Sequence, residues 1–508
     1  MSNSLAGYLL ASVTALTLAA CATAPQTTEM SDNREAVEPA QIADSYYLEA
    51  QQAVDQKYAE RQTPRAKNVI IFIGDGMGVS TITSARIYAG QAKGLDGESY
   101  KLAMEKLPWS ALSKTYSHDS QIADSAATAT ALVSGVKVPS GTLGVTQSVA
   151  RGNCATADGA GSDSLFEIAE DAGLATGIVS TARITHATPA STYSHSVDRD
   201  WENDTSVKGG CVDIALQLIE WPHGDGFEVV LGGGRSNFLT SDTQDPEYED
   251  KTGRREDGRD LMAEWNAKSD THQTITDAAG FEAMDFDSDI RVLGLFEPSH
   301  MQFELDRAED GAGEPSISDM TEAAIRRLSR DEDGYVLMVE GGRVDHAHHA
   351  GNAARALSDA AALDEAVAKA VEMTDPDETL IIVTADHSHT LMIAGYSQRN
   401  NPILGLSSSG MTPNTGADGK PYTTLGYLNG PGAVCPEMEL GCQRSDLSDR
   451  DVEDKDFLQQ SVVPMRSETH GGEDVAVFAS GPGAMLVSGV MEQNEIFHVM
   501  GRSLGLVK

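Results

Sequence analysis

The stretch NVIIFIGDGMG, residues 68–78, joins an apolar run to a glycine-rich turn that carries an aspartate. Residues 69–74 (VIIFIG) are apolar throughout, as in a strand buried on both faces of a parallel sheet. Similar runs recur as TGIVS (176–180), FEVVLGGG (227–234), YVLMVEGG (335–342), TLIIVTAD (379–386) and DVAVFASG (474–481). Helix-length segments separate them at 162–172, 211–220, 318–330 and 352–373. The alternation predicts an α/β fold with a doubly wound, mostly parallel sheet flanked by helices, and ligands at the carboxyl ends of its strands.

One long segment interrupts this rhythm. Residues 390–466 are rich in Gly, Pro, Ser and Asn and contain two of the five cysteines. We interpret this segment as a surface insertion or subdomain. The α/β domain would then be built from 65–389 and 467–508, because the strand and helix patterns continue on both sides of the insertion.

The composition is strongly acidic. Asp and Glu number 77 against 37 Lys and Arg, for a net charge of −40. This balance argues against nucleic acid as a partner, because phosphate backbones are bound by an excess of Lys and Arg. It suits a soluble protein working in salt, where self-repulsion is screened. An anionic ligand would need a local positive source.

The N-terminus predicts export. LAGYLLASVTALTLAACATAPQ, residues 5–26, is an apolar run of secretory length within which LAAC (18–21) matches a bacterial lipoprotein box. Cys21 would be the acylated residue, which favours a periplasmic or cell-surface location with a lipid anchor in the outer membrane. The alternative is an ordinary signal peptide that contains a cysteine. Residues 22–64 are interpreted as a polar tether and N-terminal segment.

The other cysteines are even in number: Cys154, Cys211, Cys435 and Cys442. In an oxidising compartment they predict two disulfides among three possible pairings.

The stretch QIADSAATATALVSG, residues 121–135, places Asp124 and Ser125 at the head of a small-residue helix. Ser and Asp are preferred N-caps, which is one interpretation. The other is that Ser125 is a nucleophile in the positive field of a helix start, where an anion is stabilised.

Carboxylates and imidazoles gather at the predicted strand ends. Asp75 lies in a glycine-rich turn, where an acid would repel a nucleotide pyrophosphate but could bind a metal. The other strand ends carry Glu340, Asp345, His346, His348, His349, Asp386, His387, His389 and His470. Imidazole with carboxylate is typical of zinc sites, and four carboxylates in one pocket need cations to stay ionised. His348 is interpreted as a bystander.

The ordered motifs GDGMG, DSAATATAL, ATGIVSTARITHATPASTYSHSVDRDW, VEGGRVDHAHH, VTADHSH and ETHGGEDVAVFASGP resemble the alkaline phosphatase family over roughly residues 65–505. The resemblance implies a phosphomonoesterase for small phosphate esters, a homodimer, and a crown-like role for 390–466. It implies disulfides Cys154–Cys211 and Cys435–Cys442. Histidines at 186 and 346, with DRDW and GLFEP, place the chain nearer the animal-type branch, which leaves the choice between magnesium and zinc at the third metal site open.

The same resemblance assigns the site residue by residue. Ser125 would be the phosphorylated nucleophile and Arg199 the phosphate clamp, whose alternative role is a surface ion pair with Asp198 or Asp200. The implied cofactors are two Zn²⁺ and one Mg²⁺. One zinc would be held by Asp345, His349 and His470, the other by Asp75, Asp386 and His387, and magnesium by Asp75, Thr188 and Glu340. Supporting residues would be Asp124, His186, His346 and His389.

A Ca²⁺ site is a further expectation, again from the animal-type branch. Its ligands would be Glu247, the Phe296 carbonyl, Glu297 and Glu314, because calcium prefers several hard oxygen ligands. Glu314 stands where the family usually has Asp, so Asp310 or Asp319 could substitute. The alternative is a solvated acidic loop.

Two other hydrolases could share such a metal scaffold: a phosphodiesterase and a sulfatase-like enzyme. Their nucleophiles generally stand in a different local motif, so DSAAT argues against both.

Overall fold

The computed structural model describes residues 44–60, 65–434 and 444–507, and its centre is a ten-stranded sheet. In spatial order the strands are β17 (Gly489–Glu492), β2 (Trp109–Lys114), β16 (Val475–Ser480), β8 (Thr379–Ala385), β1 (Asn68–Gly74), β7 (Tyr335–Gly341), β3 (Ala175–Arg183), β4 (Val229–Gly233), β6 (Arg291–Leu295) and β5 (His272–Ile275). The predicted doubly wound, mostly parallel sheet is therefore confirmed. β1, β3, β4, β7 and β8 occupy five of the six predicted runs.

The sixth run, DVAVFASG, forms β16, which differs from the expectation of a buried parallel strand. β16 pairs antiparallel with both β8 and β2, and every second residue along it is only half-buried. The direction follows from where the chain enters: His470 lies beside the site at the carboxyl edge, so a strand that starts there must run back across the sheet. β2, β5, β6 and β17 are short strands that the sequence patterns did not single out.

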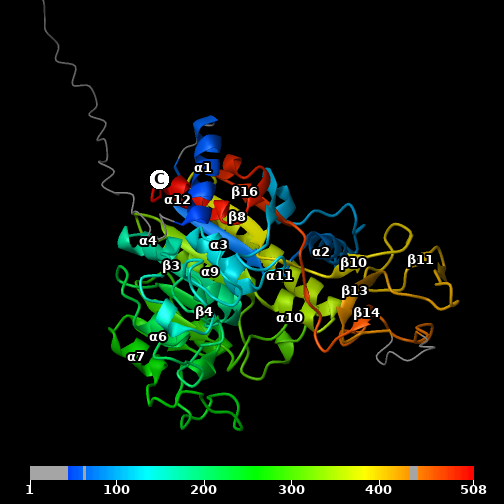
Figure 1. Ribbon diagram of the computed structural model, residues 1–508. Helices are drawn as coiled ribbons and strands as arrows, with labels where there is room; N and C mark the ends of the chain where they lie inside the picture. The colour runs from blue at the N-terminus through cyan, green and yellow to red at the C-terminus, as the bar shows by residue number, and fades with distance from the viewer. Residues whose placement is uncertain (1–43, 61–64, 435–443, 508) are drawn as a thin grey trace, which may run out of the picture. The chain divides into compact units, whose positions relative to one another are not determined.

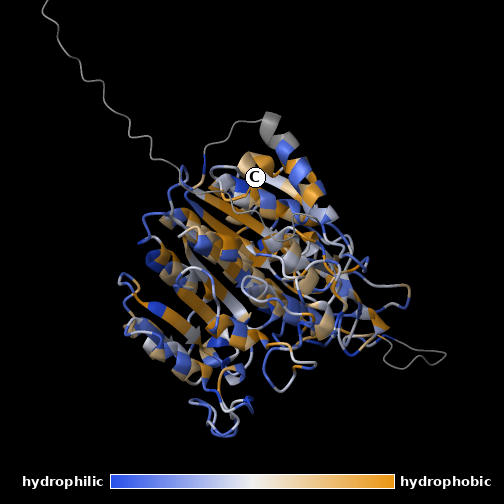
Figure 2. Ribbon diagram, turned by 60° about the vertical axis from the view of Figure 1, so that its left-hand side comes forward, coloured by the Kyte–Doolittle hydropathy of each residue, from blue (hydrophilic) through white to orange (hydrophobic). Residues whose placement is uncertain are grey.

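Each face of the sheet has its own hydrophobic core, because successive side chains of a strand point to opposite faces. In β1, Val69, Ile71 and Ile73 join one core, while Ile70 and Phe72 join the other. Figure 2 shows the strands as a hydrophobic band beneath more polar helices and loops.

The first core is covered by α1 (Ser45–Glu60), α3 (Ser125–Ser134), α4 (Leu165–Asp171), α5 (Ala187–Ala190), α6 (Ile214–Ile219), α7 (Leu261–Ala267) and α12 (Glu495–Leu504). The second is covered by α2 (Val79–Ala92), α8 (Ala278–Ala283), α9 (Ile317–Leu328), α10 (Arg343–His349) and α11 (Ala353–Met373). The predicted helical segments correspond to α4, α6, α9 and α11. None of the described helices is both long enough and apolar enough to cross a membrane.

Helix α1 falls inside the segment interpreted from sequence as a tether and N-terminal segment. Its Tyr47 is fully buried against α12, with ring contacts to Phe497 and His498. The remainder of 22–64, with Cys21 and its lipoprotein box, lies outside the described residues apart from Asp44.

The segment 390–466 contributes small sheets of its own beside α2 (Figure 1). One is formed by β10 (Leu391–Ile393), β13 (Leu425–Gly430) and β14 (Ser461–Pro464), and another by β11 (Ser408–Ser409) and β12 (Thr412–Pro413). Ile403, Leu425 and Tyr427 anchor it in the second core. Cys435 and Cys442 lie outside the described residues. At the segment's two ends, β9 (Ser388–His389) pairs with β15 (His470–Gly471).

Candidate active site and metal centres

Four neighbouring parallel strands, β8, β1, β7 and β3, deliver the candidate residues to one edge of the sheet. Asp75 follows β1, Glu340 lies near the end of β7, Asp386 and His387 follow β8, and Thr188 follows β3 in α5. A cavity of about 310 Å³ opens over this edge, and its lining includes Ser125, Arg199, Asp345, His349 and His470. These groups were expected to converge if their strands lay side by side and parallel, and the strands do so in this sheet.

Ser125 is the first residue of α3, and Asp124 is its N-cap. An Asp124 carboxylate oxygen accepts from the Ala127 N–H at 3.4 Å. Ser125 is buried, and its Oγ lies 3.1 Å from His387 Nε2 and 3.3 Å from Asp75 Oδ1. The two interpretations of this stretch are therefore compatible: Asp124 caps the helix, and Ser125 directs its hydroxyl into the cluster of candidate metal ligands.

Asp75, Asp386 and His387 form the first cluster. His387 Nε2 lies 3.4 Å from a carboxylate oxygen of each aspartate, and all three side chains are fully buried. Burial, together with the neighbouring carboxylates of Asp386 and Asp345, raises the pKa of Asp75 well above its ordinary range. Burial also raises the pKa of Asp386 and lowers that of His387. Without a cation these carboxylates resist ionisation, which is the charge pattern of a metal site.

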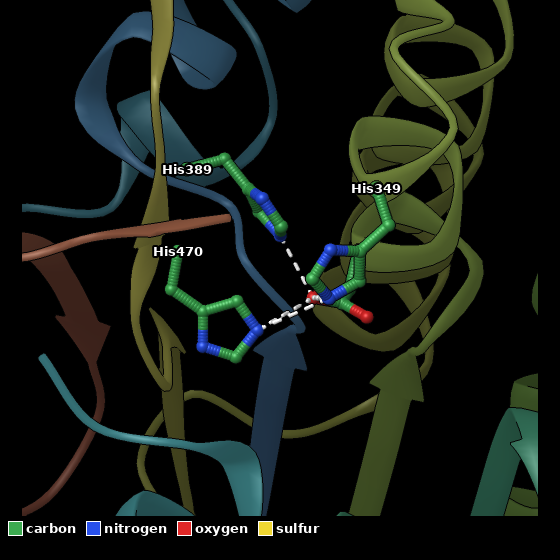
Figure 3. Close-up of side chains that lie close together, drawn as sticks. His349, His389 and His470 are labelled. Atoms are coloured by element: carbon green, nitrogen blue, oxygen red, sulfur yellow. Dashed lines mark hydrogen bonds and ion pairs between the residues drawn. The ribbon is translucent and has the colours of Figure 1, made fainter. Parts of the chain in front are cut away.

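Asp345, His349 and His470 form the second cluster. Their candidate ligand atoms lie within 3.2–3.5 Å of one another. Figure 3 shows the rings of His349, His389 and His470 converging on one point. His389 Nε2 lies 2.7 Å from Asp345 Oδ1, and hydrogen bonds to Asp345 and Glu468 raise the pKa of His389 to about 9 although burial opposes its charged form. His389 therefore donates to Asp345.

The residues expected at the third metal site also lie together. Asp75, His186 and Glu340 are close enough to share one cation. Asp75 Oδ2, Thr188 Oγ1 and Glu340 Oε1 are buried oxygens with no hydrogen-bond partner among the described residues. Burial raises the pKa of Glu340 to about 8. Three orphaned oxygens in one place fit a hard cation.

Arg199 points into the cavity from the loop after α5. Its Nη1 donates to Asp124 Oδ2 at 2.9 Å, and its Nη2 lies 3.1 Å from His186 Nε2. Asp198 and Asp200, the partners that a surface ion pair would need, both contact Arg151 instead. The arginine is therefore directed toward Ser125 rather than toward its sequence neighbours.

Two other histidines behave differently. His348 contacts the Thr81 hydroxyl and the Tyr427 hydroxyl on either side of its ring and belongs to none of these clusters. His300, which the sequence analysis did not single out, lies with His186 and His346. Arg183 faces both ring nitrogens of His300, through its backbone N–H at 3.2 Å and its Nη1 at 2.5 Å. This ring has no free lone pair for a metal, so we assign none to the three histidines.

The expected calcium ligands gather only in part. Glu247 and Glu297 lie within ligand distance of Asp310, whereas one oxygen of Glu314 accepts from the Gln302 N–H. Burial and the neighbouring carboxylates of Glu297 and Asp310 raise the pKa of Glu314 to about 9. Asp310, named as a substitute for Glu314, is the third carboxylate of this cluster. The Phe296 carbonyl accepts from Arg235 Nη1 at 3.0 Å. Burial raises the pKa of Glu247, Glu297 and Asp310, so the cluster would be stabilised by a cation.

Cys154 and Cys211 form a disulfide with a Cα–Cα distance of 5.7 Å, the pairing that the resemblance implied. It lies against a small core of Val145, Val149, Ala160, Val197 and Trp201, next to the loop that carries Arg199.

The fold and these clusters of candidate metal ligands define a metal-dependent hydrolase of the doubly wound α/β type. The family model for alkaline phosphatase matches residues 66–506, and the chain belongs to the alkaline phosphatase family. It is a phosphoric monoester hydrolase.

Relatives and solved structures agree. The chain is 46% identical to the tissue-nonspecific alkaline phosphatase of Gallus gallus, covering 86% of this chain and 84% of that protein. It is 43% identical to the alkaline phosphatase of Gadus morhua, covering 86% and 91%. The Thermus thermophilus enzyme superposes with a TM-score of 0.63 at 26% identity, covering 88% and 94%. A mutant enzyme of the Antarctic bacterium TAB5, solved with Mg bound in its M3 site, gives 0.60 at 26% identity, covering 87% and 99%.

Proposed function

We propose that the chain hydrolyses phosphate monoesters in two displacements through a phosphoserine at Ser125. In the first, Ser125 Oγ forms a bond to phosphorus, and the ester oxygen leaves as an alcohol after taking up a proton. In the second, water attacks phosphorus, and the Ser125 hydroxyl is restored as inorganic phosphate leaves. The observation that carries this proposal is the position of Ser125 Oγ, 3.1 Å from His387 Nε2 and at the start of a helix.

The residues fit two zinc ions and one magnesium ion. Asp345, His349 and His470 offer one zinc site, and Asp75, Asp386 and His387 the other, each with the imidazole and carboxylate ligands that zinc accepts. Asp75, Thr188 and Glu340 offer oxygens for magnesium. When bound, the metals supply Lewis-acid stabilisation of the attacking and leaving oxygens.

The chain's own groups bind and orient the ester. Arg199 carries a planar guanidinium that can bind two phosphate oxygens. It also places a positive charge at the site, although the chain as a whole has a net charge of −40. The first N–H groups of α3 favour an anion at Ser125. The guanidinium and the helix start together supply the local positive charge that an anionic substrate needs in so acidic a protein.

Three further features complete the proposal. Glu247, Glu297, Asp310 and the Phe296 carbonyl would hold a structural Ca²⁺. The protein would be exported to the periplasm or cell surface, with Cys21 as its lipid anchor. It would form a homodimer in which 390–466 is the crown-like region. Resemblance to the family supports the calcium site and the homodimer, and the apolar N-terminal run with its LAAC box supports export and the anchor.

The proposed reaction is tested by comparing p-nitrophenyl phosphate with bis(p-nitrophenyl) phosphate, with and without a chelator. We expect strong preference for the monoester, loss of turnover on chelation, and recovery with zinc and magnesium. Faster cleavage of the diester would favour a phosphodiesterase. Turnover that survives complete metal removal would contradict the proposed site.

A further inference from the structure

Glu468 lies just before β15, between the insertion and His470, and the sequence analysis did not single it out. Its side chain is completely buried. One carboxylate oxygen accepts from the Thr390 N–H at 2.6 Å and the Thr390 hydroxyl at 2.5 Å, and the other from His389 Nδ1. Among the described residues, His389 is its sole ion-pair partner. The charge of this buried carboxylate is therefore compensated by that ring.

The hydrogen bonds on both sides of His389 fix what this ring can do. Its Nδ1 meets the Glu468 carboxylate, and its Nε2 meets Asp345 Oδ1 at 2.7 Å. A lone pair on Nε2 facing a carboxylate oxygen at that distance would be repulsive, so a proton lies between them. An Nε2 that donates to Asp345 cannot coordinate a metal. Although four groups surround this point, three of them remain as ligands: Asp345, His349 and His470.

The backbone of Glu468 acts on a second member of the cluster. Its carbonyl accepts from His349 Nδ1 at 2.6 Å, and its N–H donates to the His349 carbonyl at 2.9 Å. A proton on Nδ1 leaves the lone pair of His349 on Nε2, which faces His470 and Asp345. One residue thus orients His349 directly and Asp345 through His389.

We propose that Glu468 is a positioning residue: its side chain holds His389 as a donor to Asp345, outside the metal's ligand set, and so leaves a coordination position open for substrate. This inference rests on the proposed zinc site. Groups that orient a metal ligand typically change metal affinity or activity 10–100-fold when removed.

The test uses full-length protein carrying Glu468→Gln, which keeps the side chain's size. Glu473→Gln is the matched control, because this exposed glutamate of the same segment contacts Ser388, next to His389. Zinc affinity is measured by chelator competition, and Co²⁺-substituted protein supplies an absorption spectrum. We expect Glu468→Gln to weaken the affinity for one metal equivalent about 10–100-fold, to alter the Co²⁺ spectrum and to lower kcat more than it raises KM. Glu473→Gln should match the wild type in all three.

A double-mutant comparison separates positioning from general support of the fold. If Glu468 acts through His389, Glu468→Gln should have no further effect on metal affinity in a His389→Ala background. Additive losses, or wild-type affinity and spectrum in Glu468→Gln alone, would overturn the inference. If the glutamine variant does not fold, Glu468→Ala is used for the same measurements of zinc affinity and Co²⁺ spectrum. If the wild type itself shows no zinc-dependent turnover, the proposed function fails instead, whatever the variants do.

Discussion

Arg199 Nη1 donates to Asp124 Oδ2 at 2.9 Å, and Asp124 is the N-cap of the helix that begins with Ser125. The proposed phosphate clamp and the proposed nucleophile are therefore positioned by one carboxylate. Asp124 Oδ1 also accepts from the Gly141 N–H at 2.9 Å, which ties a third segment to the same residue.

This relationship predicts different results for two substitutions of Asp124. Asp124→Asn keeps an effective N-cap but removes the charge that neutralises Arg199, so inorganic phosphate should inhibit more strongly while the melting temperature changes little. Asp124→Ala should also lose about 0.5–2 kcal/mol of stability through the missing cap. Thermal unfolding and phosphate inhibition constants measure both effects. Equal stability of the two variants would contradict the capping role.

Ser125→Ala should lose most monoesterase turnover and retain its metals, because the proposed phosphoserine needs its Oγ while Asp75 and His387 remain in place. Steady-state kinetics with metal analysis of the same sample tests this. A fully metallated variant with wild-type kcat would exclude the phosphoserine route.

Arg199→Ala should lower kcat/KM by about 1–3 kcal/mol and weaken phosphate inhibition, because a charge-assisted pair to the substrate is lost. Arg151→Ala is the control. Arg151 contacts Asp198 and Asp200 on either side of Arg199, but from an exposed position where an ion pair contributes little. If both variants behaved alike, the clamp would not be specific to Arg199.

Calcium should raise the melting temperature of metal-stripped protein re-supplied with zinc and magnesium, because it binds the folded state. Glu297→Ala and Asp310→Ala should each abolish that shift and leave zinc-dependent turnover largely intact. Glu314→Ala should reduce the shift less, since one oxygen of Glu314 is already held by the Gln302 N–H. The absence of a calcium-dependent shift in wild type would eliminate the site.

An ion pair between a partly exposed histidine and a buried glutamate, away from the metals, predicts how stability depends on pH. His195 Nε2 lies 3.0 Å from Glu167 Oε1, its Nδ1 contacts the Gly144 carbonyl, and although burial opposes the charge, Glu167 raises the pKa of His195 to about 9. Because folding raises this pKa, protonation of His195 stabilises the folded protein. The stabilisation is fully present below the unfolded pKa of about 6.5 and is lost as the pH rises through about 9. The Tm difference between wild type and His195→Gln should therefore be larger at pH 6 than above about pH 9.5. A constant difference across that range would contradict the ion pair.

Much of the site could be predicted because its residues lie next to strand ends in the sequence. Asp75, Glu340 and Asp386 each follow or end a run whose apolar character marks a buried strand, and parallel strands deliver such residues to one edge. His300 and Glu468 could not be found this way, and Asp310 was named only as a substitute for Glu314. They stand in loops without periodic pattern, and their roles arise from partners distant in the chain.

The sequence by itself determined the α/β class, most of the parallel strands, the helix start at Ser125 and the residue types that a metal-dependent phosphatase needs, since these depend on local periodicity and short-range chemistry. Tertiary structure decided the rest. It set the antiparallel direction of β16, turned Arg199 to Asp124, brought Asp310 within ligand distance of Glu247 and Glu297, and made His389 a donor through Glu468. Each depends on the order of strands and the return path of loops, which bring together groups that no local pattern connects.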